Sequence, residues 1–526
     1  MNFAGSPSCA IRNQVWTDSG MRVHPHGSAS MYKRMPSKDY TNSVELEDGS
    51  EPLQDDMVQE STDPSPRHSL PHVLVASLVS FLFGYHLGVV NEPLESISHD
   101  LGFSGDSLAE GVFFIYDLMK LVCIVNEGLV VSTCLGGAFL GSLFSGLIAD
   151  GVGRRRAFQL CALPMIIGAS CSATTNNLTG MLVGRFIVGI GLGIGPPVAS
   201  LYITEVSPPA VRGTYGSFIQ ISTCLGLMGA LLIGIPVKTV PGWWRICFWL
   251  STIPSTILAL AMIFCAESPH WLYKRGRNAE AEVEFQKLLG AANVRPAMAE
   301  LLKSDRGDEN DNVGISELVY GRHSRVVFIG STLFALQQLS GINAVFYFSS
   351  TVFKSAGVSS NLANAFVGIV NLLGSFIALL LMDKLGRKVL LLWSFFGMAI
   401  STVIQVVAAG LLASTYGALY LSVGGMLMFV FSFAIGAGPV PGLLLSEIFP
   451  NRIRAKAMAF CMSVHWVFNF MVGLLFLRLL ELMGAQLLYS MLGTFCLIGG
   501  VFVKRNVMET KGKTLQEIEI ALLPQD

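Results

Sequence analysis

A cluster of uncharged polar side chains interrupts one of the apolar runs of this sequence. The run extends from about Val326 to Phe348 and is long enough to cross a bilayer. Its polar members are Gln337, Gln338, Ser340, Asn343 and Tyr347, with Gly341 loosening the helix between them. Because an unpaired amide in hydrocarbon costs several kcal/mol, we expect these side chains to contact other helices and a wet cavity. Amides suit a neutral, hydroxyl-rich ligand, and the alternative is that they only hold helices together.

The composition is that of a polytopic helical membrane protein. Of 526 residues, 52% are hydrophobic and only 13% are charged, and the mean hydropathy is +0.56. Soluble domains are about 25% charged. The formal net charge of -1 argues against a nucleic-acid partner. The ten cysteines are scattered without a Cys-x-x-Cys pair, so we expect no disulfide framework, no metal site and no cofactor.

Twelve apolar segments predict an all-α membrane protein with twelve transmembrane helices in two pseudo-symmetric lobes of six. The segments are 73–91, 128–148, 157–175, 180–202, 215–236, 244–265, 326–348, 361–382, 389–411, 417–440, 456–477 and 484–503. They form an amino-terminal lobe at 73–265 and a carboxyl-terminal lobe at 324–505. The polar linker between the lobes, 266–323, contains helix-forming stretches at Ala279–Leu289 and Ala297–Leu302.

Residues 1–70 and 506–526 are predicted to be cytosolic tails. The first tail is polar and rich in Ser and Pro, which predicts disorder. Its first forty residues are weakly similar to an organelle transit peptide, but the stretch 45–63 is acidic, which transit peptides avoid. Basic residues concentrate in the even-numbered connections between spans, so the positive-inside tendency places both termini and the linker on the cytosolic side.

The stretch 111–127 does not fit the pattern of spans. It is apolar but short, and it contains Asp117 and Lys120. A thirteenth helix there would put the basic loops of the two halves on inconsistent sides, so we reject it as a span. Its removal would join Glu110 to Gly128 without a break in the pattern. We interpret it as an insertion that lengthens the first external loop, with a translated intron or a gene-model error as its origin.

Two charged motifs occur once in each half of the chain. Asp150–Arg156 corresponds to Asp383–Lys388, and Glu205–Arg212 corresponds to Glu447–Arg454, at offsets of about 233 and 242 residues. Such a duplication is typical of two-lobed transporters. Acids and bases at cytosolic helix ends can pair across helices and form a latch, whereas the positive-inside tendency alone would not explain the repeated acids. The latch candidates are Asp150, Arg154, Arg155, Glu205, Arg212, Asp383, Arg387, Glu447 and Arg454.

These motifs, together with others in the same order, resemble the sugar porter family of the major facilitator superfamily, which includes the facilitative glucose transporters. The resemblance covers roughly residues 73–515. Its further motifs are Phe83-Gly84-Tyr85, Gly184-Arg185-Phe186, Trp243-Trp244-Arg245, Glu267-Ser268-Pro269, Gln337–Tyr347, Gly436–Pro441 and Glu509–Thr514. The segments Phe83–Gly88 and Met462–Trp466 are most similar to the plastidic glucose transporter branch of plants.

The resemblance implies a hexose site with contributions from both lobes. Its members would be Gln220, Gln337, Gln338, Asn343, Tyr347, Asn371, Trp466 and Asn469. Amides would hydrogen-bond the sugar hydroxyls, and an aromatic face would stack on the sugar ring. The resemblance also adds Arg185 and Glu267 to the latch. Pro439 and Pro441, with the glycines beside them, would bend the tenth helix as a gate requires.

Three positions near these motifs depart from the family pattern. Gly442 stands where glucose facilitators usually have a tryptophan, so one wall of the site or gate is smaller. His270 and Ala266 replace the usual arginine and proline on either side of Glu267, which weakens one cytosolic latch.

His86 bears on the energetics of transport. Proton-coupled members that resemble this chain usually carry an aspartate there, and without that carboxylate we favour passive facilitated diffusion. Histidine can titrate near neutral pH, so proton coupling through His86 is the alternative. A structural histidine that hydrogen-bonds within the bundle is the simplest interpretation of this residue.

The sequence thus predicts a hexose transporter, with glucose as the favoured substrate, that works by alternating access of its two lobes. Proton-linked symport or antiport and a non-transporting sugar receptor are the alternatives. We do not expect an enzyme, because the sequence has no large polar domain, metal cluster or nucleophile motif. The partners would be the hexose and the lipid bilayer, and we expect a monomer. The resemblance favours the plastid envelope, with the Golgi and the plasma membrane as alternatives.

Overall fold

The computed structural model describes residues 67–102, 113–208, 211–306, 320–321, 323–355, 360–410, 416–449, 451–511, 513 and 517. Residues 1–66, which hold almost all of the predicted amino-terminal tail, lie outside this set. The described residues are almost entirely helical, which confirms the all-α prediction.

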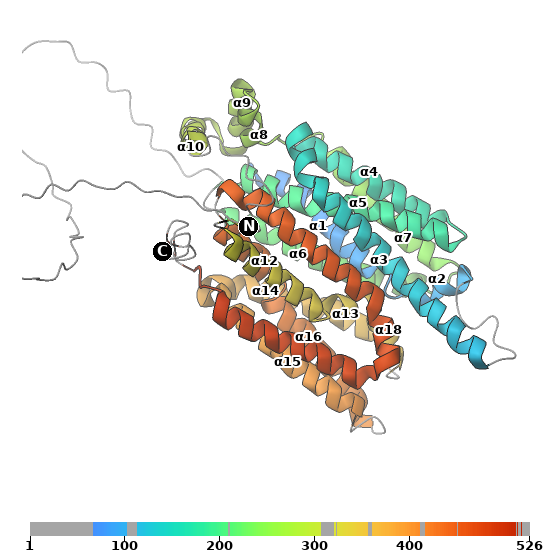
Figure 1. Ribbon diagram of the computed structural model, residues 1–526. Coiled ribbons are helices and arrows are strands. Elements are labelled where there is room, and N and C mark those ends of the chain that lie inside the picture. Colours follow the sequence, from blue (N-terminus) through green and yellow to red (C-terminus); the bar gives the residue numbers. More distant parts are fainter. Residues whose placement is uncertain are drawn as a thin grey trace, which may run out of the picture. The chain divides into compact units, whose positions relative to one another are not determined.

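The first lobe consists of six long helices and one short helix (Figure 1). They are α1 (Leu70–Gly88), α2 (Leu94–Asp100), α3 (Phe113–Val152), α4 (Arg154–Thr174), α5 (Leu178–Val206), α6 (Arg212–Val237) and α7 (Trp243–Ala261). Glycines allow α3 and α5 to approach closely. A Cβ atom added to Gly137 would lie 2.2 Å from the Phe186 carbonyl oxygen, and one added to Gly189 would lie 2.0 Å from that of Cys134.

The described part of the atypical stretch 111–127 belongs to α3. Residues 113–152 form one continuous helix, so this stretch neither forms a thirteenth helix of its own nor, from Phe113 on, extends a loop. The expectation of a longer external loop is therefore wrong for these residues. An apolar sequence that joins a helix in phase can extend its hydrogen-bond ladder, and the sequence pattern gave no break at which α3 had to begin.

Short helices fill the described part of the linker and stand at one end of the bundle in Figure 1. They are α8 (Pro269–Lys274), α9 (Asn278–Leu289), the 3₁₀ turn η3 (Ala291–Asn293) and α10 (Val294–Arg306). Helices α9 and α10 include the stretches Ala279–Leu289 and Ala297–Leu302, which the sequence predicted to be helical. Ser268 begins α8 as its N-cap, because its hydroxyl oxygen accepts a hydrogen bond from the backbone N–H of Trp271.

The second lobe contains helices that are broken within a span. Its helices are α12 (Ser324–Leu339), α13 (Ile342–Ser355), α14 (Ser360–Leu385), α15 (Arg387–Gly410), α16 (Tyr416–Ile435), α17 (Val440–Ile448) and α18 (Asn451–Asn506). Gly341, with a φ of 87°, separates α12 from α13 inside the seventh predicted span. The residues between α16 and α17 include Gly436, Gly438 and Pro439, as the expected bend in the tenth span requires.

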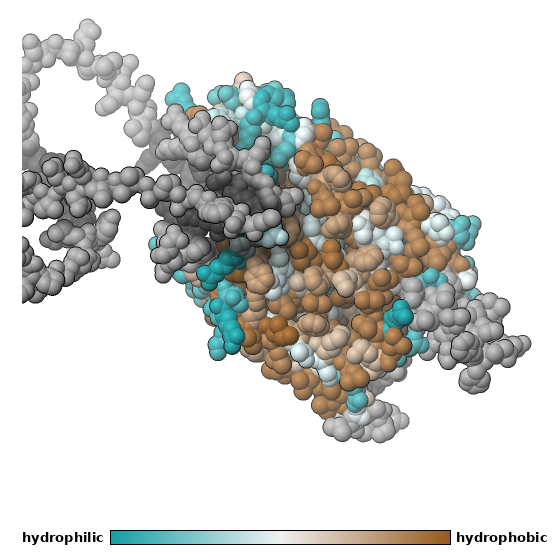
Figure 2. Space-filling model, viewed as in Figure 1, coloured by the Kyte–Doolittle hydropathy of each residue, from teal (hydrophilic) through white to brown (hydrophobic). Residues whose placement is uncertain are grey.

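Among the residues that the structure describes, eleven helical segments are long and apolar enough to cross a membrane. The last of them, Lys456–Asn506, contains the final two predicted spans, because Gly484 (φ 76°, ψ 163°) breaks α18. The fold prediction of two sets of six spans therefore agrees with the structure. Helix α3 packs against α18 and α6 packs against α14, so these two pairs join the lobes. Large apolar side chains on the outward faces form the broad brown surface in Figure 2.

Candidate functional site

The amides at the end of α12 form a chain of hydrogen bonds with their neighbours. The Gln337 amide donates to the Ala437 carbonyl oxygen (2.5 Å), and Ala437 lies in the break between α16 and α17. The Gln338 amide nitrogen lies 3.0 Å from Nδ1 of His465 on α18. Asn343, at the start of α13, donates to Oε1 of Gln338 (2.5 Å). All three amides are buried, so they connect three helices of the second lobe beside both helix breaks.

An aromatic part of the site lies on α13 and α18. The Tyr347 hydroxyl donates to Oδ1 of Asn469 at 3.1 Å. The indole of Trp466 packs edge-on against Phe83 of α1, so it reaches from the second lobe to the first. Trp466 Nε1 and Asn469 Nδ2 are buried and have no hydrogen-bond partner. Two buried donors are therefore left for a ligand to satisfy.

A third part of the site connects α6 of the first lobe to α14 of the second. The amide groups of Gln220 and Asn371 both approach the Cys224 sulfur, at 3.5 and 3.4 Å. Ser375 Oγ lies 3.1 Å from the same sulfur. Oδ1 of Asn371 is buried without a partner and is a free acceptor. The structure thus places Gln220 and Asn371 at the contact between the lobes, where both approach Cys224, a residue that the sequence analysis did not single out.

His86 and Arg185 lie together on the side of the first lobe that faces Tyr347 and Trp466 of the second lobe. His86 is fully buried, and neither of its ring nitrogens has a hydrogen-bond partner, so the interpretation of a hydrogen-bonded structural histidine is wrong. Arg185 lies on α5 and donates to the backbone carbonyls of Val130 (3.3 Å) and His86 (3.4 Å). It does not join the predicted latch residues at the linker end, because its position on α5 is about five and a half turns from Glu205.

The lobes are hydrogen-bonded to each other where α1 ends. Asn91 follows α1, and its amide donates to the Phe346 carbonyl oxygen (2.6 Å) and to Ser349 Oγ (2.7 Å) on α13. The backbone N–H of Ser350 donates back to Asn91 Oδ1 at 3.0 Å. The other end of α1 contacts the linker, since Nδ1 of His72 accepts from the Ala266 backbone. The contact between lobes therefore lies at the end opposite to the linker.

Glu92 extends this contact with a buried carboxylate. It forms an ion pair with Lys238, which follows α6, and it accepts a hydrogen bond from the Ser350 hydroxyl. It also accepts one from Asn364 Nδ2 on α14 at 2.8 Å. The sequence reasoning missed this cluster, because a single acid beside Pro93 has no counterpart in the other half of the chain.

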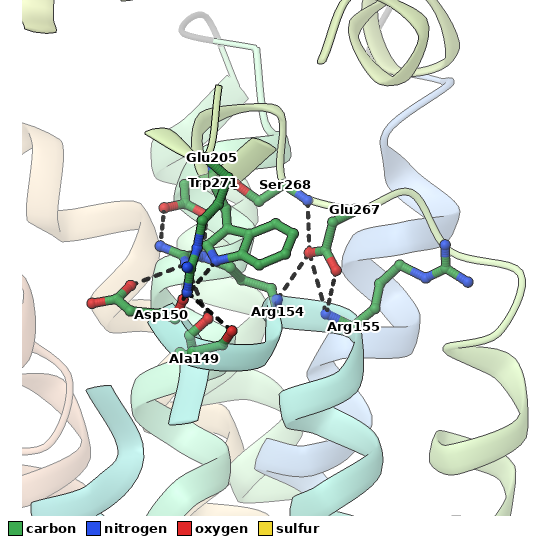
Figure 3. A network of polar contacts seen from close by, with 10 residues as sticks. Ala149, Asp150, Arg154, Arg155, Glu205, Glu267, Ser268 and Trp271 are labelled. Atoms are coloured by element: carbon green, nitrogen blue, oxygen red, sulfur yellow. Dashed lines mark hydrogen bonds and ion pairs between the residues drawn. The ribbon is translucent and has the colours of Figure 1, made fainter. Parts of the chain in front are cut away.

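Charged residues form a network at the linker end of the first lobe (Figure 3). The Arg154 guanidinium, at the start of α4, binds both carboxylate oxygens of Glu205 at 2.8 Å and contacts Asp150 at 3.1 Å. Glu267 accepts from the backbone N–H groups of Arg154 (2.9 Å) and Arg155 (3.3 Å), which are free at the start of α4. Burial raises the pKa of the Glu267 carboxyl, and its backbone donors oppose that shift.

The second lobe repeats this network. Arg387, at the start of α15, donates through Nε (3.2 Å) and Nη2 (2.9 Å) to one oxygen of Glu447. Glu509 accepts from the backbone N–H groups of Arg387 (2.8 Å) and Lys388 (3.0 Å). The Thr510 hydroxyl donates to the other oxygen of Glu447 at 2.6 Å. Glu509 was absent from the predicted latch, although its separation of 242 residues from Glu267 equals that of Glu447 from Glu205.

The remaining latch candidates lie outside these ion pairs. Arg212 is exposed at the start of α6, and Arg454 donates to the Phe449 carbonyl oxygen at 3.1 Å. The side chain of Asp383 lies outside the described set. Pro439 precedes α17 and Pro441 lies in its first turn. A Cβ atom at Gly442 would meet nothing within 4 Å, so open space lies where facilitators usually place a tryptophan.

Comparisons with known proteins agree on one family. The sequence model of the family described as "Sugar (and other) transporter" matches residues 72–522. The chain is 68% identical over 500 residues to the probable plastidic glucose transporter 2 of Arabidopsis thaliana, covering 94% of this chain and 98% of that one. It is 43% identical over 454 residues to the plastidic glucose transporter 4 of the same plant, covering 86% of this chain and 80% of that one.

Solved structures show the same fold. The proton:xylose symporter XylE, a major facilitator superfamily protein bound to 6-bromo-6-deoxy-D-glucose, superimposes with a TM-score of 0.74 at 29% identity and covers 87% of this chain and 99% of its own. The inward-open form of XylE from E. coli gives 0.71 at 27% identity, with coverage of 87% and 100%. The fold, the duplicated charged motifs and the family match lead to one conclusion. This chain is a multi-pass membrane protein that belongs to the sugar transporter family of the major facilitator superfamily.

Proposed function

We propose that this chain transports a hexose, with glucose as the first substrate to test, by alternating access of its two lobes. The observation that carries the proposal is the set of buried, unpartnered polar atoms at the lobe interface: Oδ1 of Asn371, Nδ2 of Asn469 and Nε1 of Trp466. Donors and acceptors of this kind match sugar hydroxyls, which do both. The names of the Arabidopsis relatives, plastidic glucose transporters at 68% and 43% identity, support glucose.

The contacts between the lobes correspond to one state of an alternating-access cycle. Asn91 and Glu92 join the lobes at the end opposite to the linker. The two charged networks at the linker end each lie within one lobe and the segment that follows it. Opening the first end requires the bonds of Asn91 and Glu92 to break, so they act as the gate on that side.

We propose facilitated diffusion as the mode of transport. The first span carries His86 where a proton-coupled relative would carry a carboxylate, and no acid pairs with Arg185 among the described residues. Proton-linked symport is the second candidate, because the structurally similar XylE is a proton:xylose symporter. A receptor without transport activity is the third.

The cellular setting follows from the same relatives. We propose the plastid envelope as the membrane, a monomer in the lipid bilayer as the working unit, and transport without catalysis as the activity. The positions of basic residues support linker and termini on the cytosolic side of that membrane.

The test is uptake of labelled glucose by liposomes that contain the purified chain, with and without residues 111–127 and with and without a pH gradient. We expect uptake that equilibrates, ignores the gradient and is lost in Gln337→Ala. Gln286→Ala, on the exposed face of α9, is the matched control and should transport normally. Accumulation driven by the gradient would establish symport instead. Sugar binding without uptake in either form would establish a receptor.

A further inference from the structure

A small cavity lies beside the predicted sugar site, between the two lobes. Its volume is about 10 Å³, and its polar lining comes from His86 on α1, Arg185 on α5, Tyr347 on α13 and Trp466 on α18. Cys134 on α3 adds a sulfur to the lining, and apolar side chains of the first lobe make up the rest of it. Tyr347 and Trp466 are also predicted sugar-site residues, so the cavity borders that site.

Arg185 carries a positive charge into this cavity without a compensating acid. Its side chain is 2% exposed, and it contacts two backbone carbonyls and the Phe248 ring. It forms no salt bridge with any residue that the structure describes. A charge inside a membrane protein is costly unless an opposite charge or a strong acceptor stands beside it.

The hydrogen-bonding groups around the cavity are in excess on the donor side. Arg185 Nη1, Trp466 Nε1 and both ring nitrogens of His86 are buried without a partner. Arginine and tryptophan side chains can only donate, and a neutral histidine always carries one N–H. At least three N–H donors therefore surround one cavity, and none of them bonds to an acceptor among the residues that the structure describes. A single water can accept from some of these donors, but it cannot neutralise the guanidinium.

We propose that this cavity is a subsite for a small monovalent anion at the edge of the sugar site. The volume of about 10 Å³ suits a single atom, such as a chloride ion or one oxygen of a carboxylate, and is small for a whole phosphate group. The anion is either free in solution or part of the substrate, as in a sugar acid. If the anion is part of the substrate, the inference rests on the proposed function. If the anion is free in solution, it does not.

Binding of a free anion is tested by thermal unfolding of the purified full chain in detergent. Chloride is compared with the bulky anion isethionate at equal ionic strength. We expect chloride to raise the unfolding temperature by about 2 °C or more, because a ligand that binds only the folded state stabilises it. Arg185→Met should abolish this rise and Arg185→Lys should keep it. Arg295→Met, exposed on α10, is the control for the loss of one arginine and should respond as wild type does.

His86→Asp gives a test that does not depend on the folding of Arg185→Met. It places a carboxylate beside Arg185 and so supplies the missing negative charge within the chain. We expect this variant to fold and to lose its response to chloride. A wild-type response that His86→Asp retains in full would overturn the proposal.

Binding of a carboxylate is tested by inhibition of labelled glucose uptake with glucuronate and with its neutral amide. If the substrate supplies the anion, glucuronate should inhibit about tenfold more strongly than glucuronamide, and Arg185→Met should remove the difference. If the anion is free, uptake should increase with chloride and the two inhibitors should act alike. Wild-type protein that takes up glucose and responds to neither anion would show that the cavity holds only water. Absence of glucose uptake in every medium would refute the proposed function, and the unfolding test would still decide the subsite.

Discussion

In the first lobe both oxygens of Glu205 bind the Arg154 guanidinium, whereas in the second lobe Arg387 reaches one oxygen of Glu447 and Thr510 takes the other. The side chains of the first pair are 6% and 10% exposed, and those of the second pair are 14% and 25% exposed. A bidentate, buried pair is the more costly to break. The duplicated motif therefore forms the same arginine–glutamate ion pair in both lobes, and the pair of the first lobe is the stronger.

The carboxylates that bind the helix starts show a second difference. Glu267 lies near the start of the linker that follows α7, and Glu509 lies in the segment that follows α18. The hydroxyl next to Glu267 belongs to Ser268 and caps α8, while the hydroxyl next to Glu509 belongs to Thr510 and binds Glu447. The linker thus makes its own helix at this point, and the tail instead completes the ion pair.

Removal of the arginines should give the largest effect. Arg154→Met leaves Glu205 buried without its partner and should lower the free energy of unfolding by about 3–5 kcal/mol. Arg387→Met should cost about 1–2 kcal/mol, because Glu447 is partly exposed and keeps its bond with Thr510. Unfolding temperatures in detergent measure both, with Arg295→Met as the exposed control. Equal losses of stability in Arg154→Met and Arg387→Met would contradict the unequal strength of the two ion pairs.

The glycines before the two arginines should behave alike. Gly153 and Gly386 have φ angles of 94° and 90°, and a Cβ atom on either would lie within 3 Å of the carboxylate of Glu267 or Glu509. Alanine at either position should therefore cost about 1–3 kcal/mol of stability. Gly151→Ala is the matched control, since a Cβ atom there meets nothing within 4 Å. A loss of stability in only one of the two alanine variants would show that the two charged networks differ more than their geometry indicates.

A double-mutant cycle separates the roles of the two hydroxyls. Thr510→Ala and Arg387→Met both act on Glu447, so their combined loss should differ from the sum by about 0.5–1 kcal/mol or more. Ser268→Ala and Arg154→Met should be closer to additive, because the Ser268 hydroxyl binds the backbone of α8. Thr510→Ser keeps the hydroxyl that binds Glu447, so it should retain the stability that Thr510→Ala loses. Full additivity in the second lobe would refute the shared role of Thr510.

The smallest expected effect is the pH dependence of Glu267. Burial raises the pKa of its carboxyl above the usual 4.5, so the folded state holds this proton more tightly than the unfolded chain. The resulting stability is fully present below pH 4.5 and is lost as the pH rises through the raised pKa. The stability of wild type relative to Glu267→Gln should therefore decrease from pH 4.5 towards neutrality. Unfolding temperatures over a pH series measure this, with Glu282→Gln on α9 as the control; an opposite slope would contradict it.

The sequence predicted what depends on pattern and special residues. The number of spans, the helices in the linker and the breaks at Gly341 and around Pro439 all follow from hydropathy and from residues that interrupt helices. The amides after Leu336 were placed at an interior site because lipid cannot satisfy them. These features are local, and so a single chain segment contains the information.

Pairing between distant segments could not be predicted in the same way. The latch candidates were expected to pair across neighbouring helices, but the sequence did not say which acid binds which base, and the structure pairs Glu205 with Arg154. The cluster at Glu92 joins four segments and has no repeat to reveal it. Glu509 was the exception that could have been found, since the offset of 242 residues already related Glu205 to Glu447.

The junction at Gly484 has a mechanical consequence. One non-helical residue joins the last two spans, and the helix continues directly on both sides of it. A longer connection would let the first of these spans tilt while the last remained still. Because only Gly484 separates the two spans, we expect them to move together as one rigid, bent unit. A shift of the first of these spans, which carries Trp466 and Asn469, would then move the final span and, through it, the segment that holds Glu509.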